Sequence, residues 1–536
     1  MNSIWNKNIS AYKTRFPQLA EITGCEPVLP ESLWKLENAK NGMIFASENG
    51  VRLHSAYNPE REAFSAVSRE EVLEKSSVVF YGFGLGYHIV EIAKILKTKA
   101  VQECPRLVII EPDLQHFFAA MSVLDWTDVF ALEKLVLAVG CPAESVLQLL
   151  EDSDKVNVGE TGVSDAFYFD IPSFTAHADS YFNTVRSIIK RNQRKNEINA
   201  ATLKKFGRLW CRNSLKNLEK LGECGFVSSL KNKALDSAQK PLPFLIIGAG
   251  PSLEPFLPRL NELQNRCITV CVETALRALL RSGVQPDFII LTDPQFWAYR
   301  HIAGLRAEKS VFITEISAYP SVFRFDCRAR LLCGSQFPVG QFAEKKLGLE
   351  PGNLGTGGSV ASSAWNFAHF AGAREIFTVG LDFAFPGKQT HLKGSSAEQT
   401  FHTISNRIGA AEMFSAASIF SANSIVSKDY NGNPVLTDSR MKMFSWWFES
   451  RLASCPETKT YTLSPQGLFT PGITPVSLDE VLSKKNIINE KKPFIELASN
   501  SQKCLSENQK KNLSLLVENY PRDDFLKEYP FLKEYI

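Results

Sequence analysis

Continuous apolar runs, separated by amphipathic stretches of helical period, occur in two long parts of the chain. Runs without polar alternation are typical of strands buried on both faces of a parallel sheet. Strands that alternate with helices predict an α/β fold with parallel sheets. In the first part the predicted strands are residues 77–81, 106–111, 135–139 and 167–171. In the second part they are residues 244–247, 267–272, 287–291, 311–314, 329–333 and 376–379.

The same pattern divides the 536 residues into four predicted parts. Residues 1–175 form an N-terminal cap and a Rossmann-like domain, and residues 176–239 form a helical connector. The connector contains a basic run, which is typical of a solvated helix face. Residues 240–475 form a doubly wound parallel-sheet domain. Residues 476–536 are charged and helical, and we expect them at the periphery.

Composition argues against several classes of function. The chain is 44% hydrophobic and 22% charged, with a formal net charge of +3, so nucleic acid is not expected as a partner. No uninterrupted apolar run reaches the ~18 residues of a membrane span. The N-terminus lacks a signal-peptide core, and the 11 cysteines form no C-x-x-C pair. We therefore expect a cytoplasmic protein with reduced thiols and no bound metal.

A glycine turn after the first strand of the second part is the main candidate site. Residues 243–253 are Pro-Phe-Leu-Ile-Ile-Gly-Ala-Gly-Pro-Ser-Leu. Glycine lets the backbone approach a ligand closely, and the N–H groups at a helix start favour a phosphate. Proline in the first helical turn sacrifices no N–H group. The predicted nucleotide-binding residues are Gly248, Ala249, Gly250, Pro251 and Ser252. A turn without a ligand is the alternative interpretation.

Further candidate residues fall at the same carboxyl edge of the predicted sheet. A second glycine segment precedes a helix of small residues and supplies backbone donors and hydroxyls; its members are Gly355, Thr356, Gly357, Gly358 and Ser359. Asp293 ends a strand, where an acid binds ribose, a metal or a hydroxyl, although an Asp before Pro also starts turns. We expect the two glycine segments to close around one nucleotide-linked donor.

His391 is the predicted general base, and Asp382 accompanies it as a predicted catalytic residue at the sheet edge. A loop histidine that titrates near neutral pH accepts the proton of a hydroxyl nucleophile. His402 is a second candidate in the same polar segment. A structural or idle histidine is the alternative for both.

The N-terminal domain carries a weaker motif. Gly82, Gly84 and Gly86 follow a predicted strand, and Glu111 ends the next one. This spacing is typical of a nucleotide or S-adenosylmethionine loop, in which the acid meets ribose hydroxyls. The alternative is that the glycines serve only tight packing between strand and helix.

Several spaced motifs resemble one family. They are Ile247–Leu253, Arg277–Phe288, Thr292–Pro294, Gly355–Val360 and Ile376–Phe383, with Ser55–Ala63, Asp429–Val435 and Trp446–Glu449 in support. Together they resemble the Maf proteins, the motility-associated factors that glycosylate flagellin. The resemblance covers roughly residues 40 to 470 and weakens in the C-terminal tail.

The resemblance implies an enzyme that transfers a nine-carbon acidic sugar, pseudaminic or legionaminic acid. Its donor is the CMP conjugate, its acceptors are Ser and Thr hydroxyls of flagellin, and it needs no cofactor. The implied central fold is that of bacterial sialyltransferases, with inversion at the sugar and no metal. Two positions depart from those relatives, because Ala249 and Val272 replace asparagines that hold the nucleotide. Glu273, next to the second of them, joins the predicted donor-binding residues, and the identity of the donor stays open.

Three rival functions remain. The central domain also resembles 6-hydroxymethylpterin diphosphokinases, which use ATP and need Mg²⁺ held by carboxylates such as Asp293 and Asp382. Alternatively, the chain binds flagellin as a non-catalytic accessory protein. A methyltransferase centred on Gly82 is a third interpretation.

Overall fold

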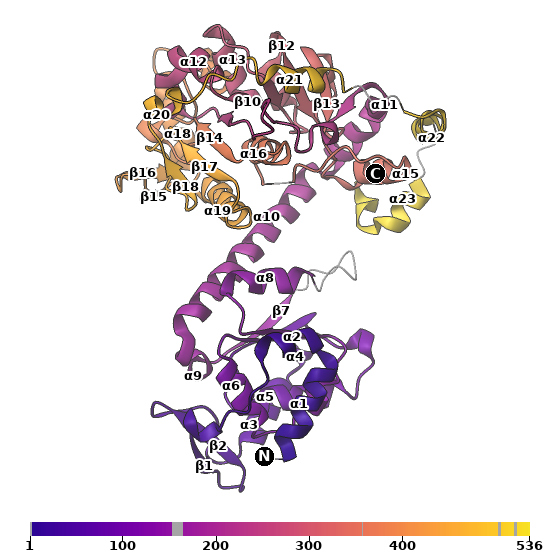
Figure 1. Ribbon diagram of the computed structural model, residues 1–536, viewed down its shortest axis with the longest axis vertical. Helices are drawn as coiled ribbons and strands as arrows, with labels where there is room; N and C mark the ends of the chain where they lie inside the picture. The colour runs from indigo at the N-terminus through magenta and orange to yellow at the C-terminus, as the bar shows by residue number, and fades with distance from the viewer. Residues whose placement is uncertain (1–2, 153–164, 356, 502–504, 519–521, 536) are drawn as a thin grey trace. The chain divides into compact units, whose positions relative to one another are not determined.

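The computed structural model describes residues 3–152, 165–355, 357–501, 505–518 and 522–535 (Figure 1). The chain divides into two compact units, residues 1–201 and 202–536. Helix α10 (Asp179–Asn217) spans the division between them. Each unit is built on its own parallel sheet, as the apolar runs predicted.

The first unit contains a four-stranded sheet of order β6-β5-β4-β7, in which each pair of neighbours is parallel. Its strands are β4 (Ser77–Tyr81), β5 (Arg106–Glu111), β6 (Leu135–Val139) and β7 (Ala166–Asp170). Three of these ranges coincide with the predicted ones, and the fourth differs by one residue. The connecting helices are α5 (Tyr87–Leu96), α6 (Leu114–Met121), α7 (Thr127–Phe130) and α8 (Ala143–Asp152).

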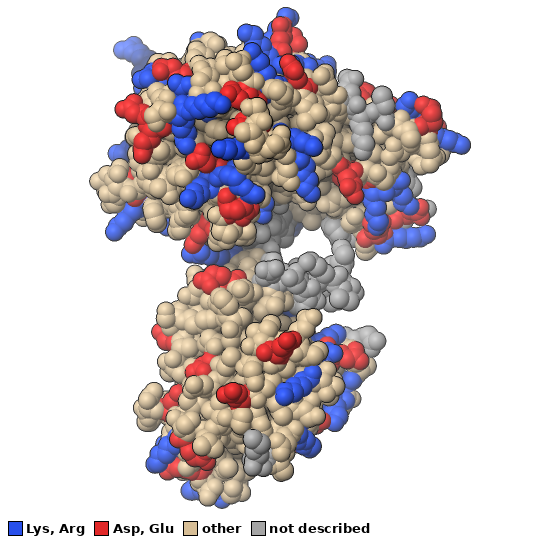
Figure 2. Space-filling view, in the orientation of Figure 1, with Lys and Arg blue, Asp and Glu red and all other residues tan. Residues whose placement is uncertain are grey.

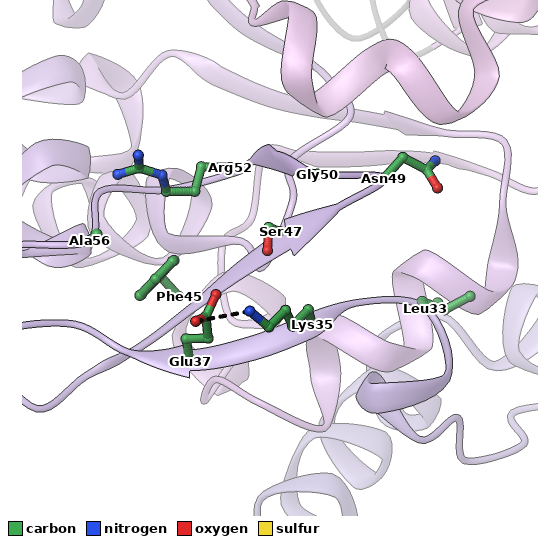
Figure 3. Close-up of a pocket in the computed structure, with 9 residues that line it drawn as sticks. All are labelled: Leu33, Lys35, Glu37, Phe45, Ser47, Asn49, Gly50, Arg52 and Ala56. Atoms are coloured by element: carbon green, nitrogen blue, oxygen red, sulfur yellow. Dashed lines mark ion pairs between the residues drawn. The ribbon is translucent and has the colours of Figure 1, made fainter.

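The N-terminal cap packs on the helices that cover this sheet through aromatic side chains. Tyr12 of helix α1 (Ser3–Arg15) meets Phe117 edge-on at 5.6 Å between ring centroids. A small antiparallel sheet follows, made of β1 (Lys35–Asn38), β2 (Ile44–Glu48) and β3 (Val51–Arg52). A cavity of about 530 Å³ opens over it, lined by side chains that include Lys35, Glu37, Ser47 and Arg52 (Figure 3). Helices α2 (Pro17–Thr23), α3 (Pro59–Val67) and α4 (Glu70–Leu73) complete the cap.

The second unit contains a nine-stranded sheet of order β18-β17-β14-β9-β10-β11-β12-β13-β8. Each pair of neighbours is parallel. The strands that sequence predicted are β9 (Phe244–Ile247), β10 (Ile268–Val272), β11 (Phe288–Ile290), β12 (Arg306–Thr314), β13 (Asp326–Leu332) and β14 (Glu375–Val379). The others are β8 (Gly225–Phe226), β17 (Lys459–Thr462) and β18 (Ile473–Pro475).

Helices cover both faces of this sheet, so its central strands are buried throughout. One core contains Ile247 and side chains of α12 (Leu260–Gln264), α13 (Glu273–Arg281) and α15 (Pro338–Lys346). The other contains Ile246 and side chains of α16 (Val360–Phe370), α19 (Ser439–Ala453) and α21 (Lys492–Ser499). The doubly wound architecture predicted for this part is confirmed.

Further short elements lie in the second unit. The helices are α11 (Lys220–Glu223), α14 (Phe296–Ile302), α17 (Ser396–Ile404), α18 (Ala411–Ser421) and α20 (Leu478–Leu482), and a hairpin joins β15 (Ile425–Lys428) to β16 (Pro434–Thr437). Throughout the described part of the chain, no helix combines the length and apolar character that a membrane crossing requires.

The C-terminal segment is more deeply packed than the sequence predicted. It contains α21, α22 (Glu507–Glu518) and α23 (Arg522–Glu528), whose apolar side chains Phe494, Leu516 and Phe525 are buried. The buried Lys491 ammonium lies 2.6 Å from a carboxylate oxygen of Asp287. The charged composition of this segment gave no sign of such packing, because a helix needs only one apolar face to pack against a core.

Candidate functional site

The order of strands in the large sheet reverses between β9 and β14. In open α/β sheets, ligands bind in the crevice outside the carboxyl ends of the strands at such a switch point. Residues 248–252 leave β9 there, and Gly380 and Asp382 follow β14. The structure thus brings two of the predicted segments, which are over 100 residues apart in sequence, to one edge.

The glycines of the β9 turn allow two backbone segments to touch. The N–H of Gly248 donates to the carbonyl of Val379, and that of Gly250 to the carbonyl of Gly380, both at 2.8 Å. A Cβ on Gly248 would collide with the Gly380 carbonyl, and one on Gly250 with the Asp382 carboxylate. The glycines are therefore required by close packing against the end of β14.

Asp382 occupies the position that the sequence assigned to a phosphate. Its Oδ2 accepts the N–H of Ser252 at 3.1 Å, and its Oδ1 accepts the Ser252 hydroxyl. The Ser252 hydroxyl also contacts Ser464 at 2.7 Å, a residue that the sequence did not single out. Burial raises the pKa of Asp382 to about 6, although both hydrogen bonds from Ser252 act against that shift. Asp382 thus holds the β9 turn in place.

Two carboxyl groups, those of Glu273 and Asp293, lie near each other at the ends of the neighbouring strands β10 and β11. Glu273 is the first residue of α13, and Asp293 accepts the N–H of Gln295 at 2.7 Å. Burial is the main cause that raises the pKa of Glu273 to about 8, and the negative charge of Asp293 adds to the shift. Its Oε2 is buried and has no hydrogen-bond partner within the described residues. At neutral pH the pair therefore offers a protonated acid beside a second carboxyl group.

His391 lies against the β9 turn. The N–H of Leu392 donates to the carbonyl of Ala249 at 2.9 Å, and the N–H of Lys393 donates to Glu254 at 2.9 Å. Burial, and then the positive charge of Arg440, lower the pKa of His391. Its Nδ1 is buried without a hydrogen-bond partner in the part of the chain that the structure describes. The imidazole is consequently neutral near pH 7 and able to accept a proton.

His301, on α14, is a residue of this region that the sequence analysis missed. Its Nδ1 contacts the Ser396 hydroxyl. Burial, and then the nearby His391, lower its pKa to about 4. The only signal for it in the sequence is its position shortly after Asp293.

The second glycine segment packs on helices. Gly355 lies against Asn366 of α16, Gly357 against Trp447 of α19 and Gly358 against Phe444 of the same helix. Ser359 is the N-cap residue of α16, and its hydroxyl is buried without a partner among the described residues. Thr356 lies outside the described residues. Because α16 leads into β14, the start of α16 lies at the carboxyl edge of the sheet. The residues that contact the second glycine segment, however, belong to α16 and α19.

The glycine loop of the first unit is filled by the protein itself. Gly82, Gly84 and Gly86 have φ of +63°, +57° and +93°, and a Cβ there would collide with Phe174, His54 and Trp126, respectively. The N–H of Leu85 donates to His54 Nε2 at 2.9 Å. Glu111 contacts His177 at 2.8 Å. This arrangement matches the interpretation that the glycines serve tight packing.

Charge is mixed over the visible surface. Figure 2 shows Lys and Arg interspersed with Asp and Glu on the face in view of each unit. This distribution agrees with the net charge of +3 and offers no continuous basic surface on that face for nucleic acid.

Two family models match separate parts of the chain. Residues 35–134 match the Glycosyltransferase Maf N-terminal domain. Residues 212–388 match the model described as 6-hydroxymethylpterin diphosphokinase MptE-like. This range includes the β9 turn, the carboxyl pair and Asp382.

Relatives and a solved structure extend the comparison. Two uncharacterized proteins of Treponema pallidum (strain Nichols) are 34% and 28% identical over 232 and 268 residues, which are 38% and 48% of this chain. These matches span 59% and 85% of the two relatives. The structure of MAf glycosyltransferase from Magnetospirillum magneticum AMB-1 aligns with a TM-score of 0.59 and 16% identity, over 94% of this chain and 78% of that one. At that identity the alignment shows a shared fold.

The fold and the domain matches define a glycosyltransferase-like α/β protein. The resemblance to the Maf family that the sequence motifs predicted is confirmed by the Maf N-terminal domain together with the MptE-like domain. The solved structure shows a shared fold, and the model matched by residues 35–134 is that of the N-terminal domain of Maf glycosyltransferases.

Proposed function

We propose that this protein transfers a nonulosonic acid, of the pseudaminic or legionaminic type, from its CMP conjugate to Ser or Thr hydroxyls of flagellin in the cytoplasm. The observation that carries the proposal is the placement of His391. Its imidazole is neutral, and its chain segment is hydrogen-bonded to the β9 turn at the switch point of the large sheet. The matched Maf N-terminal domain supports the same class of reaction.

The donor would lie along the carboxyl edge between β14 and β11. The protonated Glu273 can donate a hydrogen bond to an anionic group, and Asp293 can accept one from a ribose or sugar hydroxyl. The buried Ser359 hydroxyl is a further group without a partner in the described residues. Asp382 acts through Ser252, because it holds the turn that lines this edge.

The reaction is a direct displacement with inversion. The acceptor oxygen forms a bond to the anomeric carbon while the bond to the CMP phosphate breaks, and CMP leaves with that electron pair. His391 takes the acceptor proton. The leaving group carries a single phosphate, so donor hydrogen bonds can stabilise its charge without a metal ion.

The test is release of CMP and a matching mass increase on flagellin, with purified protein and a CMP-nonulosonic acid. We expect His391→Ala to lower kcat by about 10²–10⁴-fold, the usual scale for a general base. The matched control is His402→Ala, since the side chain of His402 is 61% exposed, and it should keep full activity. Full activity of His391→Ala would remove His391 from this role.

A pyrophosphokinase is the second candidate, favoured by the MptE-like match and by the carboxyl pair. Glu273 and Asp293 could then hold Mg²⁺ between ATP phosphates. Conversion of ATP to AMP with 6-hydroxymethylpterin, lost in Asp293→Asn, would establish it. Flagellin binding without turnover of either donor would instead identify an accessory protein.

A further inference from the structure

A cluster of imidazole and carboxylate groups lies in the first unit, among residues that the proposed reaction does not use. Glu48 ends β2, His116 lies on α6, and His177 follows β7. One potential ligand atom from each of the three lies within 4.8 Å of the other two. We propose that Glu48, His116 and His177 bind one divalent transition-metal ion.

Each histidine of the cluster is oriented by a carboxylate at its other nitrogen. His116 Nδ1 lies 2.9 Å from Asp113, which leaves His116 Nε2 facing Glu48 at 3.0 Å. His177 Nε2 lies 2.8 Å from Glu111, which leaves Nδ1 for an ion. Metal-ligating histidines almost always carry such a carboxylate or carbonyl partner, which sets the tautomer and raises ligand basicity.

The carboxylates themselves form a connected second layer. The N–H of Asp113 donates to Glu111 at 3.0 Å, and Asp113 also caps α6 through the N–H of Gln115. The side chain of Glu111 is 1% exposed, and those of His116 and His177 are 8% exposed. Three carboxylates therefore surround two imidazoles within this cluster. A bound dication would place positive charge among them.

The ligand set selects the class of ion. Two imidazoles and one carboxylate suit Zn²⁺, Co²⁺ or Fe²⁺, whereas Mg²⁺ and Ca²⁺ prefer oxygen ligands. Bonds of ~2.0–2.2 Å keep two ligand atoms at most ~4.4 Å apart. In the structure the rings of His116 and His177 stack at 4.1 Å between centroids. Two stacked rings cannot both direct an in-plane nitrogen at one ion, so binding would turn one ring out of the stack. The ion would tie β2 of the small sheet to the α/β sheet of the same unit.

The test uses the full chain after treatment with a chelator. Titration calorimetry with Zn²⁺ should give one site per chain, and Co²⁺ should give the visible absorption of a site with imidazole ligands. We expect His116→Gln and His177→Gln each to weaken binding by at least about 100-fold. Asp113→Asn removes the orienting carboxylate while Asn can still cap α6, and it should weaken binding by about 10–100-fold.

The control is His369→Gln, because His369, Cys455 and Glu457 of the second unit form another possible ligand group. Zn²⁺ binding that survives His369→Gln but is lost in Glu48→Gln supports the proposal. Glu48 is partly exposed at a strand end, so this variant should fold even where a histidine variant does not. Absence of stoichiometric Zn²⁺ and Co²⁺ binding, or binding unchanged in Glu48→Gln, overturns it.

Discussion

Burial controls the protonation of the acidic side chains at the carboxyl edge of the large sheet. Glu273 is 5% exposed and Asp382 is 4% exposed. Their pKa values rise to about 8 and about 6, respectively, mainly because burial disfavours the charged form. Two acids at one edge therefore differ in charge at neutral pH, which gives the edge both a hydrogen-bond donor and a carboxylate.

Glu273 should make the protein less stable as pH rises. Its pKa is about 8 in the folded state against a usual value of 4.5. Between these two values the folded state keeps a proton that the unfolded state releases. The free energy of unfolding therefore falls with rising pH by at most about 1.4 kcal/mol per pH unit from this group. Below pH 4.5 and above pH 8 the contribution is flat.

Urea unfolding at pH 5, 6.5 and 8 measures this effect in the wild type and in Glu273→Gln. The variant should show a shallower fall, because Gln does not titrate. Glu412→Gln, at an exposed position of α18, is the control and should keep the wild-type slope. Equal slopes in wild type and Glu273→Gln would contradict the assigned protonation.

The residues of the β9 turn show what sequence can predict at this scale. Gly248 and Gly250 were predicted to let the backbone approach a ligand closely, and in the structure they let it approach another segment of the protein. The partner at that point is Asp382 and the end of β14, which no local pattern identifies. A glycine in a turn indicates that another group packs closely against the backbone. That group, here Asp382 and the end of β14, comes from a distant part of the chain.

At the scale of elements, strands with mostly apolar residues were predicted well, and strands with polar positions or only two residues were missed. Strand β9 is apolar throughout, and β14 is buried from Ile376 onward, because both faces of the sheet are covered. Strand β8 has two residues, and β17 is Lys-Thr-Tyr-Thr with only two buried positions. Such strands form because a neighbouring strand offers its edge, so their own sequence carries little signal.

Lys491, just before α21, anchors the C-terminal helices to the sheet. Its ammonium donates to the carboxylate of Asp287 and to the carbonyls of Gln264 and Cys267. We expect Lys491→Ala to lower the free energy of unfolding by about 3–5 kcal/mol, because it leaves the Asp287 carboxylate buried without its cation. Urea unfolding curves measure the loss.

The neighbouring Lys492 provides a matched control, since it is exposed. Lys492→Ala should change stability by less than about 0.5 kcal/mol. The double variant Lys491→Met with Asp287→Asn should recover part of the loss, because no unpaired charge remains. A loss in Lys491→Ala no larger than in Lys492→Ala would show that the pair does not anchor the tail.

At the scale of the whole molecule, each unit has its own sheet, and the glycine loop of each sheet packs against groups of its own unit. The β9 turn lies beside His391 and the carboxyl pair. The loop of Gly82, Gly84 and Gly86 is packed with side chains of its own unit. We therefore place the chemistry in the second unit.

S-adenosylmethionine should not bind to the first unit. Phe174, His54 and Trp126 fill the space that its loop would have to open for a ligand. Titration calorimetry and thermal unfolding with S-adenosylmethionine should show no heat and no shift of Tm. Saturable binding that Gly84→Ala abolishes would restore the methyltransferase interpretation.

The sequence by itself determined that the chain folds as two parallel α/β sheets, where most central strands lie and which family it resembles. These follow from local patterns, because burial on both faces and tight turns leave their mark on consecutive residues. Only the tertiary structure decided that β14 lies beside β9, that Asp382 satisfies the β9 turn, and that His301 joins His391. Those contacts depend on the order in which strands pair, and pairing between distant segments is governed by the packing of the whole sheet.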